Sequence, residues 1–326
     1  EKPENSSYRI IIVAIRGYDP SFGNVEPYKT EGGFVMAEFL WKPSEERIQN
    51  SNMYRFMNFI NDRFGTDYSD YDALYHWSIE NIPDFWAALW DFVTVKASAP
   101  YESVVDDLSK MPGAQWFQGA TLNFAENLLR LRDESIALVF KTEGRKSTKM
   151  TYSQLYDEVA RTAKSLRDLG VEPGDRVVGF MPNMPVTIVA MLAATSVGAT
   201  WSSCSPDFGI NGVLDRFGQI RPKVLFTADG YAFNGKQFDS LERISQVLKE
   251  IPSVEKVVEI PHMQENPDIR KVPKAEFFRD FKSAEANLGI EFSQLPFSHP
   301  LYIMYSSGTT GLPKCMVQSA GGILLH

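Results

Sequence analysis

LYIMYSSGTTGLPK (residues 301–314) joins a short apolar run to a loop of glycines and small hydroxyl residues, and it says more about the protein than any other stretch. The run Leu301–Met304 predicts a buried strand, and the loop behind it ends in a cation, Lys314. Glycines allow close approach of the backbone, while Ser and Thr hydroxyls and a lysine can donate to phosphate oxygens. The stretch therefore predicts a polyphosphate-binding loop after a strand. A flexible turn between Met304 and Val317 is the alternative.

Two common phosphate-binding motifs do not fit this loop. A Walker loop has two glycines five residues apart followed at once by Lys and then Ser or Thr. Here Gly308 and Gly311 are three apart, and a Leu-Pro pair separates Gly311 from Lys314. The dinucleotide fingerprint GxGxxG fails on spacing as well. The loop is of another kind.

Strands and helices are predicted to alternate from residue 135 onward. The helix over 151–170 is the best marked, because Thr151 and Gln154 have the spacing of a capping box and Gly170 supplies a stop. Continuous apolar strands joined by helices predict an α/β fold, with a mostly parallel sheet covered by helices on both faces. The segments concerned are SIALVFKT (135–142), TYSQLYDEVARTAKSLRDLG (151–170), DRVVGFMP (175–182), VTIVAMLAATSVGA (186–199), TWSSCS (200–205), GINGVLDRFGQI (209–220), KVLFTADG (223–230), SLERISQVLKEI (240–251) and VEKVVEI (254–260).

Composition favours small-molecule chemistry. The chain has 326 residues, 44% of them hydrophobic, and a formal net charge of −8, which argues against a nucleic-acid or anionic-membrane partner. Its two cysteines, Cys204 and Cys315, give no disulfide framework, so a reducing, cytoplasmic location is expected. The apolar run Ile10–Ile15 is far shorter than the roughly 20 residues that span a bilayer. We expect no membrane segment.

Three regions of the chain differ in composition and in predicted secondary structure. Residues 1–36 are rich in Gly and Pro and have no assigned role. Residues 37–134 are helical and aromatic, and the tryptophans of HWSIENIPDFWAALWDF (76–92) are expected to pack a helical cap. Residues 135–326 carry the alternating pattern. The chain begins with Glu1 and stops in what reads as a new helix, so both ends are expected to be truncated.

The complete string YSSGTTGLPK resembles the phosphate-loop signature of the adenylate-forming superfamily, which contains acyl-CoA synthetases, luciferases and peptide-synthetase adenylation domains. The resemblance runs from about Phe39 to His326 and is strongest to the acetoacetyl-CoA synthetase family. Acetyl-CoA synthetases are the nearest relatives to exclude. The narrower match is carried by YHWSIENIPDFW (75–86), WFQGATLNFAENLLR (116–130), MPNMPVTIVAMLAATSVGATWSSCSPDFGINGVLDRFGQI (181–220) and LPFSHPLYIMYSSGTTGLPKCMVQSAGG (295–322).

The resemblance implies an ATP-dependent acid–CoA ligase. Acetoacetate and ATP would give acetoacetyl-adenylate and pyrophosphate, assisted by Mg²⁺, and coenzyme A would then take the acyl group and release AMP. No side-chain nucleophile is required. The residues carried over for binding the ATP phosphates are Ser306, Ser307, Gly308, Thr309, Thr310, Gly311 and Lys314.

The resemblance also assigns the regions. Residues 37–134 would be the N-terminal helical region of an acyl-CoA synthetase, and residues 135–326 the first part of the AMP-binding domain, truncated after the phosphate loop. The catalytic lysine and the hinge of the family would lie downstream of His326. The 326-residue chain alone is therefore expected to be inactive.

Two further sites are implied more weakly. Trp201, Ser202, Ser203 and Cys204 fall where the family shapes the acyl and pantetheine passage, with plain packing as the alternative. Lys236 falls where acetyl-CoA synthetases contact CoA, and an ordinary surface lysine is the alternative. The four histidines show no metal-ligand spacing, so no protein metal site is expected.

Two other functions stay open. One is a ligase for acetate or another short acid. The other is a non-catalytic fragment or pseudoenzyme that binds nucleotide weakly.

Overall fold

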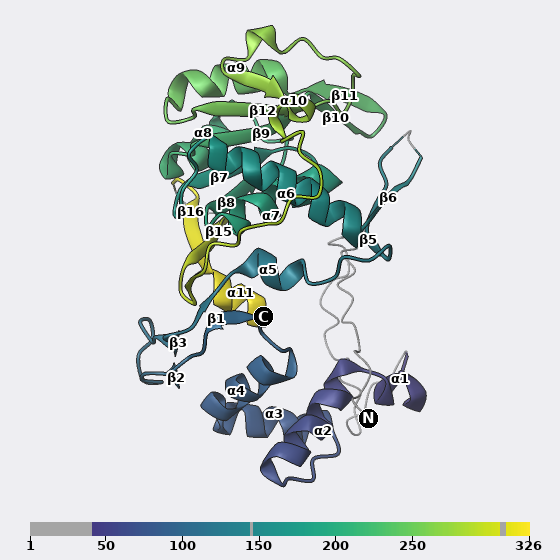
Figure 1. Cartoon of the computed structure of the whole chain (residues 1–326), viewed down its shortest axis with the longest axis vertical. Helices are drawn as coiled ribbons and strands as arrows, with labels where there is room; N and C mark the ends of the chain where they lie inside the picture. Colours follow the sequence, from purple (N-terminus) through teal and green to yellow (C-terminus); the bar gives the residue numbers. More distant parts are fainter. Residues whose placement is uncertain (1–40, 144–145, 307–310) are drawn as a thin grey trace, which may run out of the picture. The chain divides into compact units, whose positions relative to one another are not determined.

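The computed structural model describes residues 41–143, 146–306 and 311–326 (Figure 1). The chain divides into two compact units, with the break between Val95 and Lys96. The predicted strand around residues 9–15 lies outside the described residues.

The smaller unit is helical. It contains α1 (Glu45–Gln49), α2 (Asn52–Phe64), α3 (Tyr71–Glu80) and α4 (Ile82–Phe92). The side chains of Ser44, Ser51 and Asp70 cap the first three helices by accepting hydrogen bonds from backbone N–H groups. Its core is aromatic and aliphatic, as predicted, and consists of Phe56, Met57, Ile60, Leu74, Trp77 and Ala88.

A mostly parallel sheet forms the centre of the larger unit, as predicted. Within the described residues it has seven strands in the order β13-β12-β9-β7-β8-β15-β16. All neighbours are parallel except β15 and β16, which are antiparallel. The strands are β7 (Arg176–Phe180), β8 (Thr200–Cys204), β9 (Val224–Ala228), β12 (Lys256–Ile260), β13 (Ala275–Phe277), β15 (Pro300–Ser306) and β16 (Lys314–Ser319).

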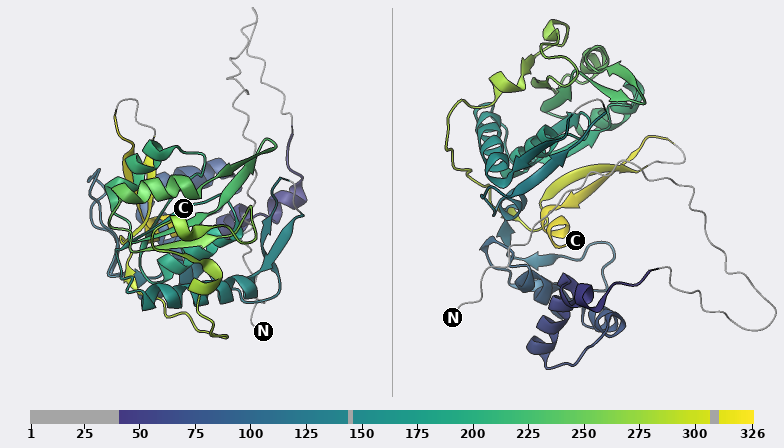
Figure 2. Two further views of the ribbon diagram at one scale, coloured as in Figure 1. Left: turned by 90° about the horizontal axis from the view of Figure 1, so that it is seen from above. Right: turned by 90° about the vertical axis from the view of Figure 1, so that its right-hand side faces the viewer.

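Helices cover both faces of this sheet (Figure 2). Two apolar clusters result, because successive strand residues point to opposite faces. Val177 packs with α6 (Tyr152–Asp168) and α7 (Pro185–Ser196), whereas Val178 packs with α8 (Ile210–Ile220) and α9 (Leu241–Glu250). The predicted capping box at the start of α6 is present, and Gly170 follows the helix with a φ of 78°.

Smaller elements surround the sheet. One three-stranded antiparallel sheet is formed by β1 (Ala97–Ala99), β4 (Thr121–Leu122) and β14 (Leu295–Pro296). Three two-stranded pairs are β2 (Ser103–Val105) with β3 (Trp116–Gln118), β5 (Ile136–Phe140) with β6 (Thr148–Thr151), and β10 (Gly230–Phe233) with β11 (Lys236–Asp239). The short helices are α5 (Phe124–Leu128), η1 (Ile269–Lys271), α10 (Phe278–Phe281) and α11 (Ala320–Leu325).

One predicted strand has a different place. The run 135–142 was expected to begin the alternation of the main sheet, but β5 pairs with β6 in a separate hairpin. Ile136 and Val139 remain 43% and 51% exposed, so the apolar run is only half covered. The β-branched content indicated a strand but not its partner.

Candidate functional site

The candidate site lies at the end of the β15–β16 hairpin. Ser306 and Lys314 are opposite each other in the register of the two strands, so the structure brings them together. Gly311 lies in the loop three residues before Lys314 and has a φ of +96°. Glycine adopts this conformation without strain. Four of the predicted phosphate-binding residues, Ser307, Gly308, Thr309 and Thr310, lie outside the described residues.

The hairpin end occupies a favourable edge of the sheet. β15 runs parallel to β8, with Tyr302 opposite Trp201, and β8 runs parallel to β7. Ser306 is therefore the last residue of its strand and lies at the same edge as the carboxyl ends of β7, β8, β9 and β12. In open α/β sheets, ligands bind outside this edge where the chain order of the strands reverses. Such a reversal occurs here, because β8 and β9 flank β7 on opposite sides.

A cavity of about 510 Å³ lies beside this hairpin end and is lined by residues of β15 and β8. β8 and β15 form much of its wall, and residues of α7, of α8 and of the loops that precede these helices contribute the rest. All four predicted passage residues line it. The lining consists of Asn183, Thr187, Ile188, Met191, Trp201, Ser202, Ser203, Cys204, Ser205, Phe208, Arg216, Tyr302, Ile303, Met304 and Tyr305.

Packing fixes the largest of these side chains. Trp201 is 5% exposed and lies against Phe226, with 6.4 Å between ring centroids. A Cβ added to Gly179 on the neighbouring strand would come within 2.8 Å of the Trp201 ring. Gly179 therefore provides the space for the indole. Trp201 both packs in the core and lines the cavity, so its role in a passage stays a prediction.

The buried strand predicted from the apolar run is only partly buried. Leu301 is 3% exposed, but Met304 is 52% exposed. On the edge strand β16, Met316 and Val317 are 40% and 57% exposed. Met304 and Met316 are opposite each other in the register of β15 and β16, so their exposed side chains lie on the same face of the hairpin.

The polar groups of the cavity are neutral apart from one guanidinium. The Ser202 hydroxyl lies 2.7 Å from the Ile303 carbonyl oxygen and 3.0 Å from the Tyr305 hydroxyl oxygen. Burial raises the pKa of the Cys204 thiol to about 12, and it also raises the pKa of Tyr305. Neither group is an anion near neutral pH. Arg216 supplies the positive charge of the lining.

Lys236 lies apart from this site. It begins β11 and is opposite Phe233 across a tight hairpin turn. The backbone N–H groups of Asn234 and Gly235, at the turn, donate to the Glu143 carboxylate over 3.1 and 3.2 Å. Lys236 is exposed and belongs to a two-stranded sheet of its own. Its contact with CoA stays a prediction.

Sequence reasoning missed Arg216 and Gln219. Both are on α8, and both contact the hairpin from about 90 residues away in the sequence. The helix also carries the polar residues Asn211 and Asp215, so no sequence signal singled out Arg216 and Gln219.

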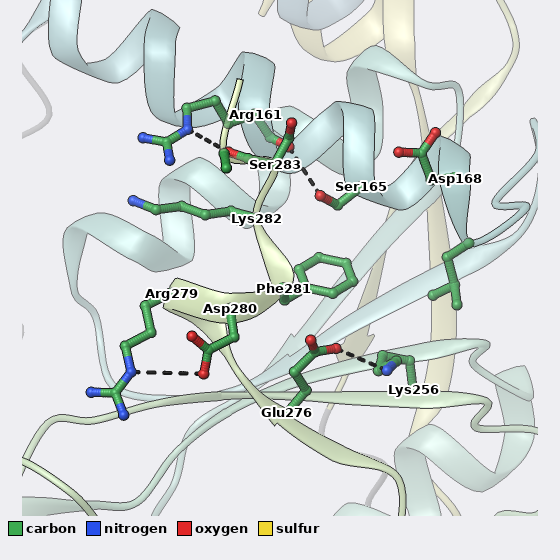
Figure 3. A pocket seen from close by; sticks show the side chains of 12 residues that line it. Arg161, Ser165, Asp168, Lys256, Glu276, Arg279, Asp280, Phe281, Lys282 and Ser283 are labelled. Carbon is green, nitrogen blue, oxygen red and sulfur yellow. Dashed lines mark hydrogen bonds and ion pairs between the residues drawn. The ribbon is translucent and has the colours of Figure 1, made fainter. Parts of the chain in front are cut away.

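A second hollow, of about 640 Å³, lies beside α6 and the segment 276–284 (Figure 3). Basic side chains surround it, but each already has a partner. Lys282 pairs with Glu158 at 2.6 Å, Lys256 with Glu276 at 2.9 Å and Arg279 with Asp280 at 3.7 Å, while Arg161 Nε donates to the Ser283 carbonyl at 2.6 Å. These contacts fasten neighbouring segments to one another. The cavity beside the hairpin is the better candidate for a ligand.

The described residues offer neither a metal cluster nor a membrane span. Across 41–143, 146–306 and 311–326, no three His, Cys, Asp or Glu side chains are grouped to hold a metal ion. No helix in the same ranges has the length and apolarity to cross a bilayer.

The fold agrees with one family. The family model for the AMP-binding enzyme matches residues 124–325, and the chain belongs to this family. A second model, the acetyl-coenzyme A synthetase N-terminus, matches residues 71–128.

The chain is similar to several acetoacetyl-CoA synthetases. It is 45% identical over 301 residues to that of Danio rerio, covering 89% of this chain and 44% of the relative. It is 43% identical over 292 residues to that of Rhizobium meliloti (strain 1021), covering 88% and 44%. The solved acetoacetyl-CoA synthetase from Streptomyces lividans superposes with a TM-score of 0.81 at 43% identity, over 87% of this chain and 44% of that one.

The resemblance read from the sequence is thereby confirmed: the chain is a homologue of the acetoacetyl-CoA synthetases. It spans about 44% of the length of these relatives.

Proposed function

We propose that this chain takes part in the ATP-dependent activation of acetoacetate and its transfer to coenzyme A. The observation that carries the proposal is the pairing of Ser306 with Lys314 at the carboxyl edge of the sheet, in a chain 45% identical to an acetoacetyl-CoA synthetase. The proposed substrates are acetoacetate, ATP and CoA. Free cysteines at 204 and 315 support a cytosolic setting.

The proposed role of the hairpin is to hold the ATP phosphates. A carboxylate is a poor acyl donor, and joining it to AMP gives it a good leaving group. The triphosphate must stay fixed while the carboxylate attacks the α-phosphorus, which demands positioning and charge stabilisation. Lys314 would neutralise charge on the β- and γ-phosphates, and Ser306 would donate a hydrogen bond. The predicted Ser307–Thr310 and Gly311 would complete the cradle.

The cavity beside the hairpin is the proposed acyl and pantetheine passage. Its walls are largely apolar, with Trp201, Met191 and Tyr302 among them. An apolar passage excludes water from a reactive adenylate. Attack by the CoA thiol forms the thioester bond and releases AMP, so no nucleophile from the protein is needed.

Another short acid is the second candidate substrate. A malonamoyl-CoA synthetase from Penicillium aethiopicum is 38% identical over 304 residues, covering 89% of this chain and 42% of the relative. The acid that is activated therefore differs among proteins similar to this chain.

A chain that only binds nucleotide is the remaining alternative. We expect residues 1–326 alone to bind ATP. We do not expect them to sustain acetoacetate-dependent exchange of pyrophosphate into ATP.

ATP affinity tests the proposal on the chain as it is. Charge-assisted hydrogen bonds contribute about 1.5–3 kcal/mol each, so Lys314→Ala is expected to weaken ATP binding about tenfold or more in calorimetry. Lys149→Ala, which removes an exposed lysine from β6, is the matched control. Equal affinities for the two variants would refute the assignment of Lys314.

A chimeric enzyme tests which acid is the substrate. Residues 41–326 replace the matched segment of the Streptomyces lividans enzyme, and pyrophosphate release is followed with acetoacetate, acetate and a long-chain fatty acid. We expect acetoacetate to be used best, and equal turnover of all three acids would refute acetoacetate as the preferred substrate.

In the same chimera, Lys236→Glu should raise the KM for CoA. An unaltered KM would remove Lys236 from the CoA site.

A further inference from the structure

The helix α8 contacts the β15–β16 hairpin at two points next to the proposed phosphate site. Arg216 and Gln219 are three residues apart on this helix and so lie on one face of it. Arg216 reaches Tyr305, which precedes Ser306. Gln219 reaches Pro313, which precedes Lys314.

The contact with β15 is aromatic and polar. The Arg216 guanidinium carbon is 4.1 Å from the Phe208 ring centroid and 5.7 Å from that of Tyr305. Arg216 Nη1 also donates to the Gly212 carbonyl at 2.8 Å, which limits its movement. On the other side, the Tyr305 hydroxyl is 3.0 Å from Ser202 Oγ. Cation–π contacts and this hydroxyl pair hold the Tyr305 side chain from two directions.

The second contact of α8 is one hydrogen bond to the residue just before β16. The Gln219 side-chain amide donates to the Pro313 carbonyl over 3.0 Å. Proline has no N–H, so the backbone of Pro313 can be held by a hydrogen bond only through its carbonyl oxygen. An anchor on Pro313 fixes the backbone immediately before Lys314.

We propose that Arg216 and Gln219 are positioning residues, which set the relative placement of Ser306 and Lys314 by holding the residue that precedes each of them. This inference rests on the proposed function for its consequence in phosphate binding, but the restraint itself is independent of any ligand. A lysine on a free strand end would lose more conformational freedom on binding than one already held.

The test uses Gln219→Met, which keeps the size and the neutral charge of the side chain but cannot donate to Pro313. Gln246→Met on α9 makes the same change at an exposed position and is the control. Tyr305→Phe removes the hydroxyl that faces Ser202. Hydrogen exchange of the peptide 311–319 is measured without ligand, and the affinity for tripolyphosphate and the Tm are measured alongside.

We expect Gln219→Met to speed exchange in 311–319 and to weaken tripolyphosphate binding by about threefold or more, with little change in Tm. Tyr305→Phe should weaken binding in the same way. Unchanged exchange in Gln219→Met overturns the inference, as does faster exchange with unchanged affinity. A large fall in Tm would show a structural role instead. If the wild-type chain fails to bind tripolyphosphate, the proposed function fails, and the exchange result alone decides whether α8 restrains the hairpin.

Discussion

The Glu259→Gln variant tests how a buried acid affects the stability of the central sheet. Glu259 lies on β12 with 0% of its surface exposed, and among the described residues neither carboxylate oxygen has a hydrogen-bond partner. The nearby carboxylate of Asp229 is also buried, but it accepts backbone N–H groups from His262, Met263 and Gln264 at 2.7 to 2.8 Å. Glu259 lacks such donors, so a negative charge on its buried carboxylate is costly.

The direction of the pH effect follows from the pKa. The pKa of Glu259 is raised from its ordinary 4.5 to about 8, mainly by burial; the charge of Asp229 adds to the shift, and Arg279 opposes it. Between these two pH values the folded chain holds one more proton than the unfolded chain. The free energy of unfolding then falls by about 1.4 kcal/mol for each pH unit. From pH 5.5 to pH 7.5 this group removes about 2–3 kcal/mol of stability.

Urea unfolding followed by circular dichroism at the two pH values measures this loss. Gln does not titrate, so Glu259→Gln should lack the decline, and the difference in unfolding free energy between variant and wild type should grow by about 2–3 kcal/mol from the lower to the higher pH. Glu276→Gln, on the adjacent strand β13 and paired with Lys256, is the control. Parallel pH dependences for wild type and Glu259→Gln would show that Glu259 is ionised or solvated in the folded chain.

Two further substitutions test packing and buried hydrogen bonds. A Cβ added in Gly321→Ala would lie 2.0 Å from the Phe297 ring, so we expect a loss of about 1–3 kcal/mol in stability, read as a lower Tm, whereas Gly289→Ala, with open space around it, should change little. The buried amide of Asn123 donates to three backbone carbonyl oxygens at 2.8 to 3.1 Å, so Asn123→Ala should cost about 1–3 kcal/mol in a urea titration, and a loss near zero would mean that water replaces the amide.

Much of the fold could be predicted because local signals and burial agree. The capping box of Thr151 and Gln154, followed by Gly170, marked the helix that the structure shows as α6. The apolar strands at 176–180, 200–204 and 224–228 were predicted as members of a parallel sheet and are. The strand at 136–140 was predicted but placed wrongly, because strand composition does not specify the pairing partner.

The candidate site was only partly readable from the sequence. Ser306 and Lys314 were chosen for their chemistry, and their opposition across the hairpin adds a geometric reason. Trp201 and its neighbours do line the cavity next to β15. The contacts of Gln219 with Pro313 and of Arg216 with Tyr305 depend on how α8 packs near the hairpin, and no local pattern encodes a contact between such distant positions.

Protection of Lys314 from chemical acetylation by ATP tests the central claim most directly. Lys314 is exposed at the start of β16, so it should react readily in the free chain. The account predicts that saturating ATP or pyrophosphate slows acetylation of Lys314, measured by mass spectrometry, while exposed Lys149 on β6 reacts at an unchanged rate. Acetylation of Lys314 at the same rate with and without saturating ATP would contradict the assignment of this hairpin as the phosphate site.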